Sequence, residues 1–179
     1  MEKFLLHACC APCSVKCVDS LRKEGIEPAL FWFNPNIHPY TEYQNRLSAL
    51  RQYAAGHKLE LTEHGIYGLR PFIENIADNI EGRCGYCYWS RLVKTAEYAA
   101  DNGYSQFSTT LLISPYQRHE MIAAAAKKAA ERCGVEFVYR DFRPMFREGQ
   151  AAARSEGFYM QKYCGCVFSE EERYMGNKE

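Results

Sequence analysis

The chain has 179 residues with a globular composition, 47% apolar, 25% charged and 14% aromatic, which excludes wholesale disorder and collagen-like or low-complexity classes. Lysine plus arginine equals aspartate plus glutamate at 22 each, so no net positive charge attracts a polyanion. No apolar run approaches the roughly 18 residues of a membrane span, and no export signal precedes the first apolar run. We therefore expect a cytoplasmic protein with no membrane partner.

Short apolar runs alternate with helix-length segments through the first 140 residues. Strands are predicted over residues 4–8, 29–33, 58–62, 104–110 and 135–139. Helices are predicted from a Ser14 cap to Gly25, from Thr41, from Pro71 through Ile80, after Cys84 to Gly103, and over 119–133. This alternation is typical of right-handed βαβ units. It predicts a Rossmann-like α/β fold with a parallel sheet covered by helices on both faces.

After Asp141 this alternation ends. A helix is predicted over residues 146–155, followed by an irregular segment over 158–166. The pattern Ser169-Glu170-Glu171-Glu172 then predicts the cap of a last short helix. We expect one domain over residues 1–179, made of an α/β core (1–140) and a C-terminal extension (141–179) that folds back over the site.

The chain contains nine cysteines. An odd count without a signal peptide argues against a secreted disulfide framework, so the thiols should be reduced or metal-bound. Cys133 stands alone at a predicted helix end and needs no function. The other eight form three groups: Cys9, Cys10, Cys13 and Cys17; Cys84 and Cys87; Cys164 and Cys166.

The first group follows the first strand, where parallel α/β sheets bind ligands. Cys13 lies near a predicted helix N-terminus, which stabilises the thiolate that ligates metals. Adjacent cysteines in an extended chain point opposite ways, so we expect Cys9 and Cys10 to serve two metals or two sides of one cluster. Cys17 shares the helix face of Cys13 but also matches the spacing of buried core residues.

Cys84 and Cys87 form a C-x-x-C motif at the start of a predicted helix. This spacing suits zinc, an iron–sulfur cluster or a redox dithiol. A thioredoxin-type dithiol should follow the first strand, so the position in mid-chain favours a metal. A structural zinc site made of Cys9, Cys10, Cys84 and Cys87 remains the alternative.

Cys164 and Cys166 are too closely spaced to bind one tetrahedral ion comfortably. A C-x-C pair is suited to a strained, easily reduced disulfide, so we expect a redox-active pair. Two unrelated cysteines in the tail are the alternative.

Signals for nucleic-acid binding are weaker. Residues 117–162 carry nine basic and six acidic side chains, and aromatic residues interleaved with them can stack on an unpaired base. Solvated helix faces explain the same charges. Ser114, Tyr116 and Gln117 follow a strand at the rim expected to hold Cys9, and we assign them with Arg91 as candidate substrate-binding residues.

Four motifs together resemble the cobalamin-independent epoxyqueuosine reductases. They are residues 6–13 (LHACCAPC), 84–92 (CGYCYWSRL), 107–117 (FSTTLLISPYQ) and 159–169 (YMQKYCGCVFS). The resemblance spans nearly the whole chain, with the motifs in the expected order. It implies a fold related to nucleotide α-hydrolase-like domains. It also implies reduction of the epoxide of epoxyqueuosine at the wobble position of tRNA, which gives queuosine in the last step of that pathway.

The resemblance also implies a [4Fe–4S] cluster and an additional mononuclear iron. The resemblance implies no cobalamin, and ATP is not expected because cysteines replace the ATP-binding loop of related folds. We expect Cys10, Cys84 and Cys87 to hold the cluster with Cys9 as a fourth or bridging ligand. Cys9 and Cys13 would then contact the second iron, and Cys164 and Cys166 would relay electrons or protons from an unidentified donor.

Two alternatives from other classes stay open at this point. A zinc-stapled RNA-binding module would share the fold but would be colourless and inactive on epoxides. A thiol–disulfide oxidoreductase would need no metal and would reduce model disulfides.

Overall fold

A five-stranded parallel sheet forms the centre of the molecule. The computed structural model describes residues 3–176. The strands are β1 (Phe4–His7), β2 (Pro28–Trp32), β3 (Leu61–Glu63), β4 (Gln106–Thr109) and β5 (Glu136–Phe137). Their order is β3-β2-β1-β4-β5, with every pair parallel. This order confirms the predicted Rossmann-like α/β class.

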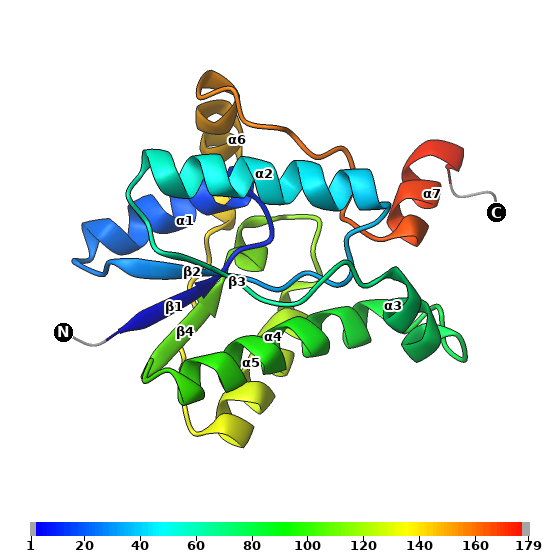
Figure 1. Cartoon of the computed structure of the whole chain (residues 1–179), viewed down its shortest axis with the longest axis horizontal. Helices are drawn as coiled ribbons and strands as arrows, with labels where there is room; N and C mark the ends of the chain where they lie inside the picture. Colours follow the sequence, from blue (N-terminus) through cyan, green and yellow to red (C-terminus); the bar gives the residue numbers. More distant parts are fainter. Residues whose placement is uncertain (1–2, 177–179) are drawn as a thin grey trace.

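Helices cover both faces of the sheet (Figure 1). On one face lie α1 (Ala11–Lys23) and α2 (Tyr40–Gly56), and on the other lie α4 (Arg83–Asp101) and α5 (His119–Cys133). The shorter elements are α3 (Leu69–Ile76), the 3-10 turns η1 (Thr110–Ile113) and η2 (Arg143–Met145), α6 (Phe146–Ser155) and α7 (Val167–Met175). Among residues 3–176, no helix combines the length and the apolar character needed to cross a membrane.

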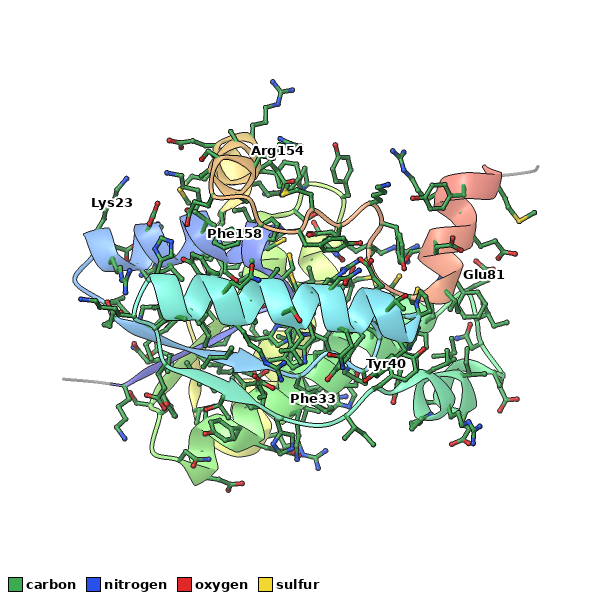
Figure 2. All side chains as sticks on the ribbon, turned by 45° about the horizontal axis from the view of Figure 1, so that its top comes forward. Lys23, Phe33, Tyr40, Glu81, Arg154 and Phe158 are labelled. Carbon is green, nitrogen blue, oxygen red and sulfur yellow. The ribbon has the colours of Figure 1, made fainter. Side chains whose placement is uncertain are left out.

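The central strands are buried along their whole length. All residues of β1 and β2 are buried, as expected for a parallel sheet with two covered faces. Side chains fill the space between the layers, and Phe158 extends this packing beyond the sheet (Figure 2). It packs edge-on against Tyr53 of α2, with ring centroids 5.8 Å apart. The apolar core therefore continues under the C-terminal extension.

The C-terminal extension returns to the carboxyl edge of the sheet. After α5 and β5, α6 packs against α1. Residues 156–166, which we call the strap, then run from α6 past α2 to α7 (Figure 1). The predicted return of this extension over the site is thus observed.

Polar side chains join β1 to β4 where both strands end. His7 is fully buried, with Nδ1 2.9 Å from Thr109 Oγ1 and Nε2 3.2 Å from the Phe33 carbonyl. Because a carbonyl only accepts, Nε2 carries the proton and Nδ1 accepts from the threonine. Burial lowers the pKa of His7 to about 4, so the ring is neutral near pH 7. These bonds hold the ends of the two strands side by side.

Three predicted helix boundaries are wrong. Helix α1 begins at Ala11 rather than after a Ser14 cap, because Pro12 suits the first turn and Ser14 Oγ donates back to the Cys10 carbonyl at 2.7 Å. Helix α7 begins at Val167 with Cys166 as its cap, so Ser169 lies inside its first turn. Helix α3 ends at Ile76, which leaves Ile80 exposed.

Replacing Gly68 by alanine is expected to destabilise the fold. Gly68 precedes α3, and a Cβ there would lie 2.6 Å from Pro35 Cβ and 2.9 Å from its backbone. We expect a loss of about 1–3 kcal/mol in unfolding free energy, measured by urea denaturation. Gly56→Ala is the control, because its Cβ meets nothing within 4 Å. Equal stability of both variants would show that the Pro35 loop does not depend on this close approach.

Candidate metal centre and pocket

Three cysteine sulfurs gather at the carboxyl edge of the sheet, between β1 and α1. The Sγ atoms of Cys9, Cys10 and Cys13 all lie within 4.8 Å of one another, and those of Cys9 and Cys10 are 3.7 Å apart. The expectation that adjacent cysteines point apart is therefore wrong. Cys10 is the last extended residue before α1, and the change from strand to helix geometry there removes the alternation.

Neighbouring polar groups favour one thiolate in this group. Thr110 Oγ1 donates to Cys9 Sγ at 3.3 Å and accepts from the Cys9 amide at 3.1 Å. Hydrogen bonds from the Cys10 and Cys13 thiols, with that from Thr110, hold the pKa of Cys9 well below its usual range. Burial raises the pKa of Cys10. Hydrogen bonds with Cys10 and Cys9 raise the pKa of Cys13. Cys9 is therefore the thiol of this group that ionises most easily.

The strap contributes a further donor to the same sulfurs. Gln161 Nε2 lies 2.9 Å from Cys10 Sγ and 3.6 Å from Cys13 Sγ. Its Oε1 atom is buried without a hydrogen-bond partner among the described residues. Clustered soft sulfur ligands, with N–H and O–H donors aimed at them, suit zinc, Cu(I) or an iron–sulfur cluster. The residues present therefore fit a metal centre.

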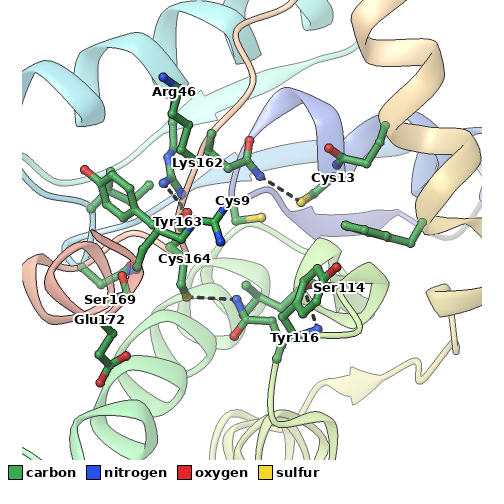
Figure 3. A pocket seen from close by; sticks show the side chains of 18 of the residues that line it. Cys9, Cys13, Arg46, Ser114, Tyr116, Lys162, Tyr163, Cys164, Ser169 and Glu172 are labelled. Carbon is green, nitrogen blue, oxygen red and sulfur yellow. Dashed lines mark hydrogen bonds between the residues drawn. The ribbon is translucent and has the colours of Figure 1, made fainter. Parts of the chain in front are cut away.

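A pocket of about 540 Å³ opens beside this group (Figure 3). Its walls come from the cysteine loop after β1, the loop after β4, and the strap with α7, together with residues of the loop after β2, of α2, of α4 and of α6 (Figure 3). Four cationic side chains and one carboxylate line it, namely Arg46, Arg91, Lys162, Arg173 and Glu172. The pocket therefore favours an anionic ligand although the whole chain is neutral.

The loop after β4 presents an exposed aromatic ring at this pocket. Tyr116 is 86% exposed and packs edge-on against Phe146, with centroids 5.8 Å apart. Ser114 Oγ accepts from the Tyr116 amide at 3.3 Å and orders the turn. A ring held in this way offers one free face for stacking.

Cys84 and Cys87 lie in the first turn of α4, as predicted, but outside the group of three sulfurs. Cys87 packs in a separate apolar cluster with Phe72, Ile76 and Cys166. Burial raises the pKa of Cys87 to about 12, and the nearby charge of Arg91 opposes this shift. Neither Cys84 nor Cys87 lines the pocket.

Cys164 faces the pocket at the end of a hydrogen-bonded chain. The Arg118 amide donates to Tyr88 Oη, the Tyr88 hydroxyl donates to Gln117 Oε1 at 2.6 Å, and Gln117 Nε2 donates to Cys164 Sγ at 3.2 Å. Because the Tyr88 hydroxyl fixes the Gln117 amide, its NH₂ group points at the sulfur. Both Cys164 and Cys166 are free thiols here, so the redox-active disulfide stays a prediction.

Arg46 of α2 ties the strap to the core. Its Nη1 and Nη2 atoms donate to the carbonyls of Cys164 at 2.8 Å and Tyr163 at 2.9 Å. Its Nε atom donates to Glu42 at 2.6 Å, and both side chains are buried. Tyr159 of the strap donates to the other Glu42 oxygen. This buried ion pair therefore holds the C-x-C segment at the pocket.

The structure brings most of the predicted site residues together. Seven of them line the pocket: Cys9, Cys13, Cys164, Arg91, Ser114, Tyr116 and Gln117. Cys10 completes the group of three sulfurs, whereas Cys84, Cys87 and Cys166 lie outside the lining. Cys17 is fully buried on the core side of α1, and Cys133 is the last residue of α5; neither lines the pocket.

Sequence reasoning missed Asn36, Arg46 and Gln161. Arg46 meets the strap across 117 and 118 positions of sequence, and Gln161 meets Cys10 across 151. No local pattern marks such contacts. Asn36 is buried in the pocket wall, with Oδ1 unpartnered among the described residues. Its only signal was its position in a turn-rich segment after the second strand.

Comparison with known proteins decides the family. The model of the family described as epoxyqueuosine reductase QueH matches residues 4–172. The chain belongs to this family. An epoxyqueuosine reductase QueH of Dehalococcoides mccartyi is 40% identical over 172 residues, covering 96% of this chain and 94% of that protein. The QueH of Thermotoga maritima is 35% identical over 182 residues, covering 97% and 93%. The predicted resemblance and oxidoreductase class are confirmed.

A solved structure shares the architecture at low identity. The crystal structure of a predicted subunit of tRNA methyltransferase from Methanocaldococcus jannaschii superposes with a TM-score of 0.53 and 14% identity. The match covers 87% of this QueH-family chain and 89% of that one. It supports the fold class alone.

Substituting Arg46 is expected to destabilise the protein strongly. Arg46→Met leaves the Glu42 carboxylate buried without its cation, which costs about 3–5 kcal/mol in unfolding free energy. Arg51→Met is the matched control on the same helix, because its pair with Glu63 is exposed and is worth at most about 1 kcal/mol. Urea denaturation measures both variants. Equal losses would contradict the role assigned to the buried pair.

Proposed function

We propose that this chain reduces the epoxide of epoxyqueuosine at the wobble position of tRNA to an alkene, giving queuosine in the last step of its biosynthesis. The observation that carries the proposal is the pocket beside three clustered, buried thiols in a QueH-family chain. Family membership supports the reaction, and the geometry supports a site where a nucleoside meets sulfur-rich redox chemistry.

The reaction needs two electrons and two protons. The epoxide oxygen leaves as water when both C–O bonds break and the two carbons form a double bond. Negative charge develops on the oxygen as the first bond breaks, so the site must stabilise that charge and deliver protons. An external electron donor supplies the reducing equivalents.

Cysteines of this site would hold an iron–sulfur centre. Cys9, Cys10 and Cys13 are the observed group, and Cys84 and Cys87 remain the proposed further ligands. Such a centre, with a [4Fe–4S] cluster and a second iron, supplies one-electron transfer and Lewis acidity. Gln161 and Thr110 donate to the sulfurs and so orient them as ligands.

The pocket walls would bind and orient the modified nucleoside. Tyr116 offers a ring face on which a base can stack, which is the usual way proteins hold an unpaired RNA base. Lys162 and Arg173 line the same pocket and suit the flanking phosphates. The strap covers the cysteines and limits access of water to the reacting carbons.

Cys164 would move a proton at its sulfur. Gln117 donates to Cys164 Sγ, so the thiol proton is free to point into the pocket. Arg46 donates to the Cys164 carbonyl and so fixes the backbone of this residue. Cys164 would act with Cys166 as the redox-active pair that passes reducing equivalents and protons.

Anaerobically purified protein is expected to be brown. We expect iron and acid-labile sulfide in the protein and broad absorption that bleaches on reduction. With a chemical reductant it should remove one oxygen atom from epoxyqueuosine in tRNA, detected by mass spectrometry of released nucleosides. Cys10→Ser should lower both the metal content and the turnover, because it removes one sulfur of the group of three, and Cys133→Ser is the control.

Other outcomes would favour the alternatives from other classes. A colourless protein that retains zinc after anaerobic reconstitution with iron and sulfide would favour a zinc-stapled RNA-binding module. Reduction of model disulfides by metal-free protein, without turnover of epoxyqueuosine, would favour a thiol–disulfide oxidoreductase.

Alanine substitution of the C-x-C pair tests its part in the chemistry. Cys164→Ala is expected to slow turnover about 10²-fold, the usual effect of losing a positioned proton donor. Cys166→Ala is expected to slow turnover less than Cys164→Ala, because Cys166 lies outside the pocket lining. Anaerobic assays with a chemical reductant measure both, against Cys133→Ala. Unchanged turnover in Cys164→Ala would remove this thiol from the chemistry.

A further inference from the structure

Arg91 is a fully buried arginine without a carboxylate partner. Its side chain is 2% exposed, and it takes part in no ion pair among residues 3–176. The other fully buried arginine, Arg46, is paired with Glu42. Burying an uncompensated cation is costly, so the site should supply a negative charge near Arg91.

Both side-chain hydrogen bonds of Arg91 go to Cys87. Its Nε atom donates to the Cys87 carbonyl at 3.1 Å, and Nη2 donates to Cys87 Sγ at 3.0 Å. The two residues lie one helical turn apart on α4, so the guanidinium group can donate to the Cys87 carbonyl and to its sulfur at the same time. A charge-assisted bond of this kind fixes the position of the sulfur.

No carboxylate is among the groups that act most strongly on Arg91. The acidic groups that act on it most strongly are the thiols of Cys87, Cys164 and Cys9, followed by Tyr88, whose ring centroid lies 5.8 Å away. Arg91 also lines the pocket, whereas Cys87 does not. The guanidinium thus connects the C-x-x-C motif with the pocket that holds Cys9 and Cys164.

We propose that Arg91 is a positioning residue that fixes the Cys87 sulfur through its hydrogen bond and whose permanent positive charge offsets the negative charge of the metal centre. This inference rests on the proposed function. The potential of an iron–sulfur centre depends on its net charge and on hydrogen bonds to its sulfurs. A buried cation beside the ligand therefore favours the reduced, more negative state and raises the midpoint potential.

Charge-removing and charge-keeping variants test this role. Arg91→Met, Arg91→Lys and wild type are purified anaerobically, and circular dichroism verifies the fold. Iron and sulfide per chain are measured, and the midpoint potential is obtained by mediated titration followed by absorbance. Lys94→Met is the matched control, because it removes one partly exposed cation from the same helix.

We expect Arg91→Met to retain less metal and to shift the reduction equilibrium at least tenfold toward the oxidised state. For a one-electron couple this is roughly 59 mV more negative. The midpoint potential of Arg91→Lys should stay close to that of wild type. Lys94→Met should match wild type in both metal content and potential.

Two results would overturn the proposal. If loaded, active wild type and Arg91→Met share the same metal content and potential, Arg91 does not compensate the centre. If Arg91→Lys loses as much as Arg91→Met, its charge is not what the centre uses. Wild type that binds no iron would instead refute the proposed function, and this inference with it.

Discussion

The side-by-side ends of β1 and β4 determine where chemistry can occur in this molecule. The strand order reverses there, because the chain leaves β1 toward β2 on one side and β4 lies on the other. Such reversals open a crevice at the carboxyl edge of a parallel sheet. Thr110 bridges this crevice by contacting both the amide and the sulfur of Cys9. The sheet topology therefore determines where the cysteine group lies.

The C-terminal extension converts this crevice into a pocket. Arg46 and Glu42 form a buried pair under the strap, and Gln161 brings an amide onto the cysteine sulfurs. Cys164 then faces the pocket from the strap side, held by Gln117. Donors from the segment after β4 and from the strap thus converge on sulfur. Because four cationic side chains and one carboxylate line the same space, a chain without net charge presents a cationic, sulfur-rich pocket.

Sequence patterns predicted the fold class and much of the candidate site. Apolar runs and helical spacing placed β1, α5 and α6 closely, because burial on two faces and amphipathic periodicity are local signals. Ser14 misled because its hydroxyl bonds back to a carbonyl inside α1 instead of capping that helix. The convergence of Cys9, Cys10 and Cys13 depended on a change of backbone geometry at Cys10 that residue spacing does not encode. Arg46 escaped notice because its partners lie more than 100 residues away.

Locating iron by anomalous scattering in crystals of the anaerobically loaded protein tests the central claim most directly. The account predicts iron bound by Cys9, Cys10 and Cys13 at the carboxyl edge of the sheet, adjoining the pocket. Zinc there, or iron bound elsewhere while these three cysteines stay free, would contradict it.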